Sequence, residues 1–168
     1  MSVFHAPVPR VADASPCIGL AKVGRLDVLS VGGRVVLITD TVAEEIQAGR
    51  EDDPARQALQ RGWGTRTAGI QVPAELAEWH LDAGEEATLA LARHIGGVAV
   101  LDDGNGRKAA RALGIAHMGT IGLVVEARRQ GIVTSAAELL RRLYQAGLFL
   151  PSDAILQALL QTVGEGWP

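Results

Sequence analysis

Aromatic residues are scarce in this sequence, and cysteine occurs once. Phenylalanine, tryptophan and tyrosine make up 4% of the 168 residues, against a total hydrophobic content of 48%. This composition is typical of a globular α/β or α protein with an aliphatic core, and it excludes fibrous and disordered classes. Cys17 has no second cysteine to pair with, so an internal disulfide is excluded and a reducing compartment is compatible with the sequence.

Long apolar runs are also missing. No stretch approaches the ~18 consecutive apolar residues that a membrane-spanning helix needs. The segment MSVFHAPVPR lacks a charged start followed by an apolar stretch, so it does not resemble a secretion signal. We therefore expect a cytoplasmic protein. The net charge of −3 argues against a protein that coats nucleic acid by positive charge alone, but it is compatible with a local acidic cluster that binds metal.

Short apolar segments alternate with helical patterns along the chain. Strands are expected at residues 10–12, 35–38, 98–101 and 115–118, with a short edge strand within 62–73. Helices are expected between these strands and at 120–130, 135–144 and 152–163. This alternation predicts a parallel sheet with helices on both faces. In such sheets a ligand binds at the carboxyl ends of the strands, near a switch in strand order.

Acidic residues recur where the predicted strands end and where helices begin. In chain order they are Asp13, Glu44, Glu45, Glu85, Asp102 and Asp103. The carboxyl ends of parallel strands share one rim, so these carboxylates are expected to converge there. Converging carboxylates repel and are pushed toward protonation. A hard divalent cation such as Mg²⁺ or Mn²⁺ removes that penalty and can activate water for phosphodiester hydrolysis.

The first acidic residues also have structural explanations. Asp13 could cap the first helix, but Ser15 followed by Pro16 is better placed to do so. Thr41 and Glu44 fit a capping box, in which each side chain bonds to the other residue's backbone amide. Successive helical residues point about 100° apart, so only one of the adjacent glutamates can face a common site. We expect that residue to be Glu45.

The later acidic residues leave the same alternatives open. Asp82 with Glu85 fits another capping box, so the evidence for Glu85 as a ligand and as a cap is balanced. Asp102 and Asp103 could be turn residues before Gly104. Two adjacent acids at the end of a buried strand nevertheless favour a metal site, and Asp103 is the preferred ligand of the two.

A resemblance to a known family begins in the segment VADASPCIGLAKVGRLDVL, which is similar to the opening of PIN-domain proteins. It continues in VVLITDTVAEEIQAG, in LDAGEEATLALARHIGG and in VAVLDDGNGRKAARALGIAHMGTIGLVVEARRQGIV, and spans about residues 11–163. The sequence resembles in particular a prokaryotic branch related to VapC-type toxins, which similarly has a Gly-Glu helix start, a double aspartate and an added C-terminal helical region.

The resemblance implies a three-layer α/β/α fold with a central parallel sheet. It implies a single domain over residues 1–168, with a core at about 10–130 and a C-terminal helical extension at about 131–168. The implied activity is Mg²⁺- or Mn²⁺-dependent cleavage of RNA. The positions that match the acidic metal site are Asp13, Glu45, Glu85 and Asp103, with Asp102 as a neighbouring ligand. Ser15 and Thr120 match polar positions beside this site and are expected to position the substrate. Arg107 follows the acidic turn, where it could position the substrate by binding RNA phosphates or could belong to a solvated helix face.

The sequence departs from the family pattern in three places. Pro7 and Pro9 precede a first strand that is usually apolar throughout. Thr39-Asp40 stands where relatives often have a proline-containing helix entry. Gly104-Asn105-Gly106 replaces a basic turn, which removes one expected phosphate contact.

Several functions are compatible with these features. The first is a metal-dependent endoribonuclease, either the toxin of a type II toxin–antitoxin pair or a related RNA-processing enzyme. The second is a PIN-fold module without useful catalysis that binds RNA or protein. A nucleotide-binding enzyme is a distant third, because Asp102 and Asp103 would repel a pyrophosphate at the glycine-rich turn. The apolar C-terminal helices predict a homodimer or an antitoxin partner.

Overall fold

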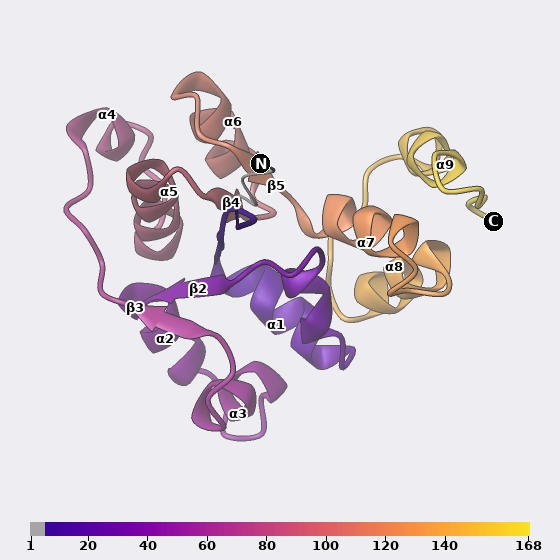
Figure 1. The fold of residues 1–168 in the computed structure, drawn as a ribbon, viewed down its shortest axis with the longest axis horizontal. Coiled ribbons are helices and arrows are strands. Elements are labelled where there is room, and N and C mark those ends of the chain that lie inside the picture. Colours follow the sequence, from indigo (N-terminus) through magenta and orange to yellow (C-terminus); the bar gives the residue numbers. More distant parts are fainter. Residues whose placement is uncertain (1–5) are drawn as a thin grey trace, which may run out of the picture.

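The computed structural model of the protein describes residues 6–168, so the first five residues of the segment MSVFHAPVPR lie outside the described residues. The centre of the molecule is a five-stranded parallel sheet in the order β3-β2-β1-β4-β5 (Figure 1). The strands are β1 (Arg10–Ala12), β2 (Val36–Thr39), β3 (Thr65–Thr67), β4 (Val98–Val100) and β5 (His117–Met118). The parallel sheet predicted from the sequence is thus confirmed.

Helices connect the strands and continue beyond the last one. They are α1 (Ala14–Lys22), the 3₁₀ helix η1 (Leu26–Ser30), α2 (Asp40–Gln47), α3 (Pro54–Gln60), α4 (Ala74–Ala77), α5 (Ala83–Ile95), α6 (Gly104–Ala112), α7 (Thr120–Arg129), α8 (Ala136–Gln145) and α9 (Asp153–Gln161). Strand β1 pairs with β2 on one side and with β4 on the other. The strand order therefore reverses beside β1, and Asp13 follows β1 at this switch point.

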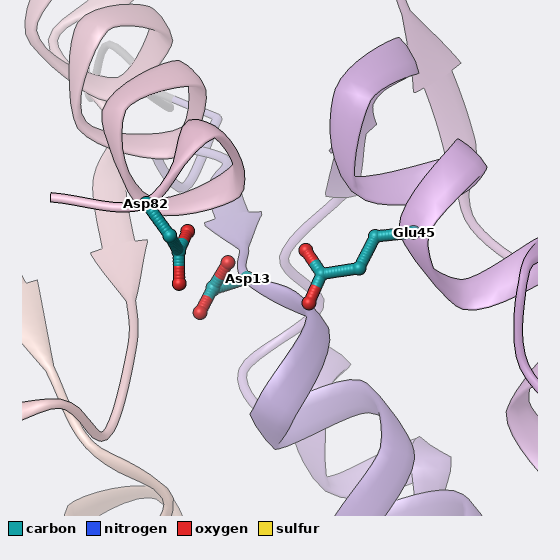
Figure 2. Close-up of side chains that lie close together, drawn as sticks. All are labelled: Asp13, Glu45 and Asp82. Carbon is teal, nitrogen blue, oxygen red and sulfur yellow. The ribbon is translucent and has the colours of Figure 1, made fainter.

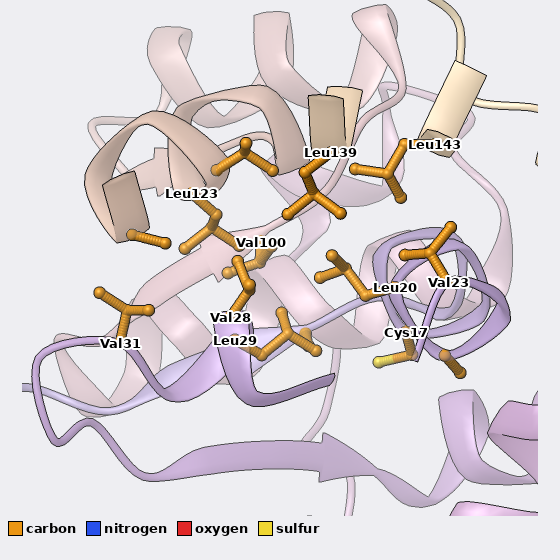
Figure 3. Packing of buried hydrophobic residues seen from close by; sticks show 14 of the residues in the cluster. Cys17, Leu20, Val23, Val28, Leu29, Val31, Val100, Leu123, Leu139 and Leu143 are labelled. Atoms are coloured by element: carbon orange, nitrogen blue, oxygen red, sulfur yellow. The ribbon is translucent and has the colours of Figure 1, made fainter. Parts of the chain in front are cut away.

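Both faces of the sheet are buried under helices. Alternate strand residues point to opposite faces, so Ala12 and Val100 belong to one hydrophobic cluster and Val11 and Ala99 to the other. Helices α1, α7 and α8 cover the first face, where Leu20, Leu123 and Leu139 surround Val100 (Figure 3). Helices α4, α5 and α6 supply the residues that cover the second face. These layers confirm the three-layer α/β/α fold.

The C-terminal helices α8 and α9 join the first of these clusters. Their side chains Leu140, Leu143, Leu156 and Leu160 are almost fully buried. After α9, the Glu165 carboxylate accepts hydrogen bonds from the Arg128 and Ser135 side chains and from the first two backbone amides of α8. The end of the chain is thus fixed to α7 and α8.

Two predicted helix caps are wrong. Helix α1 begins at Ala14 with Asp13 at the N-cap position, so Ser15 lies inside the helix. Helix α2 has Thr39, not Thr41, as its N-cap, and the Thr39 hydroxyl accepts a bond from the Val42 amide at 3.2 Å. In both cases the helix follows its strand without a connecting loop, which places the cap earlier than predicted. The capping box of Asp82 and Glu85 is confirmed.

Within residues 6–168, no helix combines the length and the apolar character required to cross a membrane.

Candidate metal centre

Three carboxylates from separate parts of the chain meet at the carboxyl end of β1. Asp13, Glu45 and Asp82 each offer one oxygen, and these oxygens all lie within 4.8 Å of one another. Asp13 follows β1, Glu45 lies on α2, and Asp82 is the N-cap of α5. Figure 2 shows the three side chains pointing toward a common space. Carboxylate oxygens at this spacing are suited to a hard divalent cation.

Asp13 is the most buried member of the cluster. Its residue is 5% exposed, and its backbone amide is fixed by a 2.9 Å bond to the Val100 carbonyl. Although it occupies the N-cap position of α1, its side chain makes no capping bond. Its Oδ1 has no hydrogen-bond partner among residues 6–168. A buried polar atom without a partner is uncommon, and a bound ion is one of its recognised explanations.

Helix α2 directs only one of its two adjacent glutamates toward Asp13. Glu45 belongs to the cluster. The Glu44 side chain is 72% exposed and lies 3.8 Å from the Arg66 guanidinium. This separation follows from the helical rotation of about 100° per residue.

The start of α5 approaches the other two carboxylates closely. Asp82 Oδ1 accepts a 2.8 Å bond from the Glu85 amide, which fixes the Asp82 side chain. Gly84, in the first turn of α5, has no side chain to separate the helix from the cluster. A β-carbon at Gly84 would lie 2.7 Å from Glu45 Oε2 and 3.2 Å from Asp13 Oδ1. Glycine is therefore required at this position for the carboxylates to keep their arrangement.

Burial and mutual repulsion raise the pKa values of the clustered acids. Burial is the largest cause for Asp13, and the charges of Asp82, Glu45 and Glu85 add to it, so its pKa rises to about 7 although the nearby Ala14 backbone amide opposes the shift. Burial and the charge of Asp82 also raise the pKa values of Glu45 and Glu85. A divalent cation would offset the repulsion and favour the ionised forms.

Glu85 lies next to the cluster and is 6% exposed. Its Oε2 accepts the Asp82 amide at 3.3 Å, and the charges of Asp103 and Glu45 contribute to its raised pKa. Gly106 of α6 lies nearby, where a β-carbon would be 3.6 Å from Glu85 Oε1, an ordinary contact distance, and 2.5 Å from Leu101 Cδ1. Glu85 thus connects the three-carboxylate group with the acidic end of β4.

The two aspartates after β4 are already bonded within the protein. Asp102 accepts 2.7 Å bonds from the backbone amide and the hydroxyl of Thr120, which hold the start of α7. Asp103 is the N-cap of α6 and accepts bonds from the amides of Asn105 and Gly106. Neither aspartate is in the group of oxygens within 4.8 Å, and both lie at the same rim.

The residues expected to position the substrate are at the edge of this rim. Ser15 is exposed in the first turn of α1 and lines a cavity together with Asp102 and Thr120. Thr120 is 1% exposed, and its hydroxyl is used by Asp102. Arg107 is exposed on α6 and lines a neighbouring cavity with Asp102.

Asp82 is the member of the cluster that sequence reasoning missed as a site residue. Asp82 belongs to a capping box, and this structural role is enough to explain an aspartate at that position. No local sequence pattern distinguishes a helix cap that also faces a metal site from one that does not. A possible signal was Gly84, because a glycine in the first turn of a helix rich in alanine and leucine indicates a close approach to another group.

A family model agrees with this fold. The model of the family DUF3368, described as a PIN domain, matches residues 9–165. No curated protein matches the chain at a significant level. PIN domains are generally nucleases that act on nucleic acid with divalent metal ions, and the carboxylate cluster fits such an ion. From the parallel sheet, the acidic rim and this match, we conclude that the chain belongs to the PIN-domain family.

Proposed function

We propose that this chain is an endoribonuclease that depends on Mg²⁺ or Mn²⁺. The observation that supports the proposal most directly is the group formed by Asp13, Glu45 and Asp82, in which one oxygen of the buried aspartate has no partner among the described residues. Asp13 has a raised pKa because it is buried beside other acids, and this cost is accounted for if the site holds a cation.

In this proposal the three carboxylates bind the ion directly. A bound divalent ion supplies an activated water and neutralises charge on the scissile phosphate. Gly84 leaves the space in which Glu45 and Asp13 face each other. Glu85 and Asp103 complete the acidic rim, and their negative charge strengthens the attraction for a cation.

The residues beside the carboxylates divide into two roles. Ser15 and Arg107 are exposed, so we assign them to contact with substrate phosphates. Thr120 is buried and bonds to Asp102, so we assign it to holding that carboxylate in place.

We propose that the substrate is RNA and that the protein acts as the toxin of a toxin–antitoxin pair.

We also propose a partner surface on the C-terminal helices, which would bind an antitoxin or a second copy of the chain. Two exposed apolar side chains there support it, Tyr144 on α8 and Ile155 on α9. Sedimentation at several protein concentrations tests the homodimer. Co-expression with the product of the adjacent gene tests the antitoxin.

The test of the activity is Mn²⁺-stimulated cleavage of a mixed RNA substrate. Asp13→Asn should abolish cleavage while the far-ultraviolet circular dichroism spectrum stays unchanged. The alternative, a binding module without catalysis, predicts that the wild-type protein binds RNA but does not cleave it with Mg²⁺ or Mn²⁺. Cleavage by the Asp13→Asn variant at the wild-type rate would refute the metal-dependent mechanism.

A further inference from the structure

Helix α6 carries positive charge that the protein does not neutralise. Arg107, Lys108 and Arg111 lie within about one turn of the helix, whose sequence GNGRKAARA contains no acidic residue. All three side chains are exposed, and none takes part in an ion pair within residues 6–168. Residues three and four apart share one surface of a helix, where like charges repel each other. This repulsion is therefore not relieved inside the protein.

The three cations of α6 line one cavity of about 530 Å³. Figure 1 shows α6 beside β5, the edge strand of the sheet. The other side of the cavity is lined by residues of β5 and of the start of α7, His117, Met118, Gly119 and Gly122. Among the described residues, no carboxylate lines this cavity. The cavity therefore differs from its smaller neighbour, which contains a single cation together with Asp102.

Two arginines near the opposite edge of the sheet are arranged differently. Arg66 on β3 forms an ion pair with Asp40 at the start of α2. Arg50, after α2, forms a 2.9 Å ion pair with Asp52. The charges of these arginines are neutralised by neighbouring residues, whereas those of α6 converge on a cavity and have no counterion there.

We propose that this cavity is a phosphate-binding site separate from the metal centre, and that it takes a phosphate monoester. Such a group carries a charge of about −1.5 to −2 at pH 7 and has three acceptor oxygens. A backbone diester has a single charge and would leave most of the positive charge of α6 without a counterion. The guanidinium of an arginine can also bind two phosphate oxygens at once, and α6 supplies two arginines.

A phosphate monoester can reach the cavity in two forms. It can be free phosphate, or it can be the phosphorylated end of a nucleic-acid strand. The second form rests on the function proposed above. It would hold the strand end on the α6 side of the acidic rim, because Arg107 lines both this cavity and the one that contains Asp102. A carboxylate of a protein partner is a poorer match, since it has one charge and two oxygens.

Free phosphate is tested by calorimetric titration with inorganic phosphate in EDTA at constant ionic strength. Lys108→Gln and Arg111→Gln should each weaken binding by about tenfold or more, the effect of losing a charge-assisted hydrogen bond. Both side chains are exposed, so the fold should survive, which circular dichroism checks. Arg129→Gln is the matched control, because it removes one exposed positive charge at the last residue of α7, outside this cavity. It should bind phosphate as the wild type does.

The strand end is tested with a single-stranded RNA that carries fluorescein at its 3′ end and either a phosphate or a hydroxyl at its 5′ end. Anisotropy is measured in EDTA, so that metal-dependent cleavage cannot occur. If the cavity takes the strand end, the phosphorylated RNA should bind about tenfold more tightly, and Arg111→Gln should remove this difference. If inorganic phosphate binds through Lys108 and Arg111 but the two RNAs bind equally, the site takes free phosphate.

Two results would overturn the proposal. Equal losses of affinity for both RNAs in Arg111→Gln, without binding of inorganic phosphate, would show that the cavity contacts backbone diesters. Wild-type behaviour of Lys108→Gln and Arg111→Gln in both measurements would show that it is not a phosphate site.

The phosphate site and the nuclease can fail separately. If phosphate binding depends on Lys108 and Arg111 but the protein does not cleave RNA with Mn²⁺, the nuclease proposal fails and the phosphate site stands. If the protein cleaves RNA with Mn²⁺ and either overturning result is obtained, only the phosphate site fails.

Discussion

A β-carbon at Gly84 would lie 2.7 Å from Oε2 of Glu45, closer than a β-carbon approaches a non-bonded atom. Gly84 lies on α5 and Glu45 on α2. Because Gly84 has no side chain, the Glu45 carboxylate can occupy the space beside α5. This contact makes the carboxylate cluster sensitive to a change that removes no charge.

Gly84→Ala is therefore expected to displace the Glu45 carboxylate and weaken Mn²⁺ binding by at least about tenfold, comparable to the loss of an outer-shell partner of a metal ligand. The fold should survive, because Glu45 is a flexible side chain that can move and alanine favours a helix. Calorimetric titration with Mn²⁺ measures the affinity. Gly69→Ala is the matched control, since nothing lies within 4 Å of a β-carbon there. Equal affinities in both variants would contradict the steric account.

Asp82 and Asp103 offer a comparison between two helix caps at the same rim. Each accepts backbone amide bonds at the start of its helix, and asparagine can replace aspartate in that role. Only Asp82 belongs to the group within 4.8 Å. We expect Asp82→Asn to lower Mn²⁺ affinity by more than about tenfold, and Asp103→Asn to lower it by less, since ligands are more sensitive than neighbours. The reverse order would identify Asp103 as the ligand.

Asp13 should make the metal-free protein less stable as the pH rises. Its pKa is about 7 in the folded protein, against 3.8 for an ordinary aspartate, so the folded state holds its proton longer than the unfolded state does. Stability from this group therefore falls between about pH 4 and pH 7, by at most about 4 kcal/mol. In EDTA, Asp13→Asn should unfold at a higher temperature than the wild type at pH 7.5 and lose most of this advantage at pH 4. An advantage that does not change with pH would contradict this expectation.

Glu165 should have the opposite pH dependence. Burial alone would raise its pKa, but bonds from the Ala137 and Ala136 amides, Arg128 and Ser135 outweigh this and lower the pKa to about 2. Its contribution to stability is therefore complete above about pH 4.5 and is lost as the pH falls toward 2.

Glu165→Gln should lower the free energy of unfolding at pH 7 by about 1–3 kcal/mol, because buried donors lose a charged acceptor. Urea denaturation at pH 7 and at pH 2.5 measures the difference, which should shrink at the lower pH. Glu138→Gln is the control, since its exposed pair with Arg141 contributes at most about 1 kcal/mol. No loss of stability at pH 7 would show that the C-terminal segment is not fixed through Glu165.

The fold and part of the site could be predicted from the sequence. Alternating apolar segments and helical patterns specify a parallel sheet, and the acids after its strands mark one rim, which led to Asp13 and to Glu45 rather than Glu44. Helical rotation is a local property, and it predicted that only one of the two glutamates would face Asp13. The choice of Glu45 depended on a capping box of Thr41 and Glu44, and that cap was predicted two residues too late, since the N-cap of α2 is Thr39.

Other features could not be predicted because they depend on contacts between distant elements. Asp82 looks like a helix cap, and only the packing of α5 against α2 brings it to Asp13. The bond of Asp102 to Thr120 requires the start of α7 to lie beside the end of β4. Phe149 has the sequence pattern of a core residue between two apolar helices, and its exposure follows from the turn between α8 and α9.

The central claim is that Asp13, Glu45 and Asp82 together hold one divalent ion, and adjacent residues of α2 test it most directly. Calorimetric titration with Mn²⁺ should detect one site in the wild-type protein and in Glu44→Gln, whose altered side chain lies in solvent, and should detect a loss of at least about tenfold in affinity in Glu45→Gln. Equal binding by the two variants, or no binding by the wild-type protein, would contradict the account.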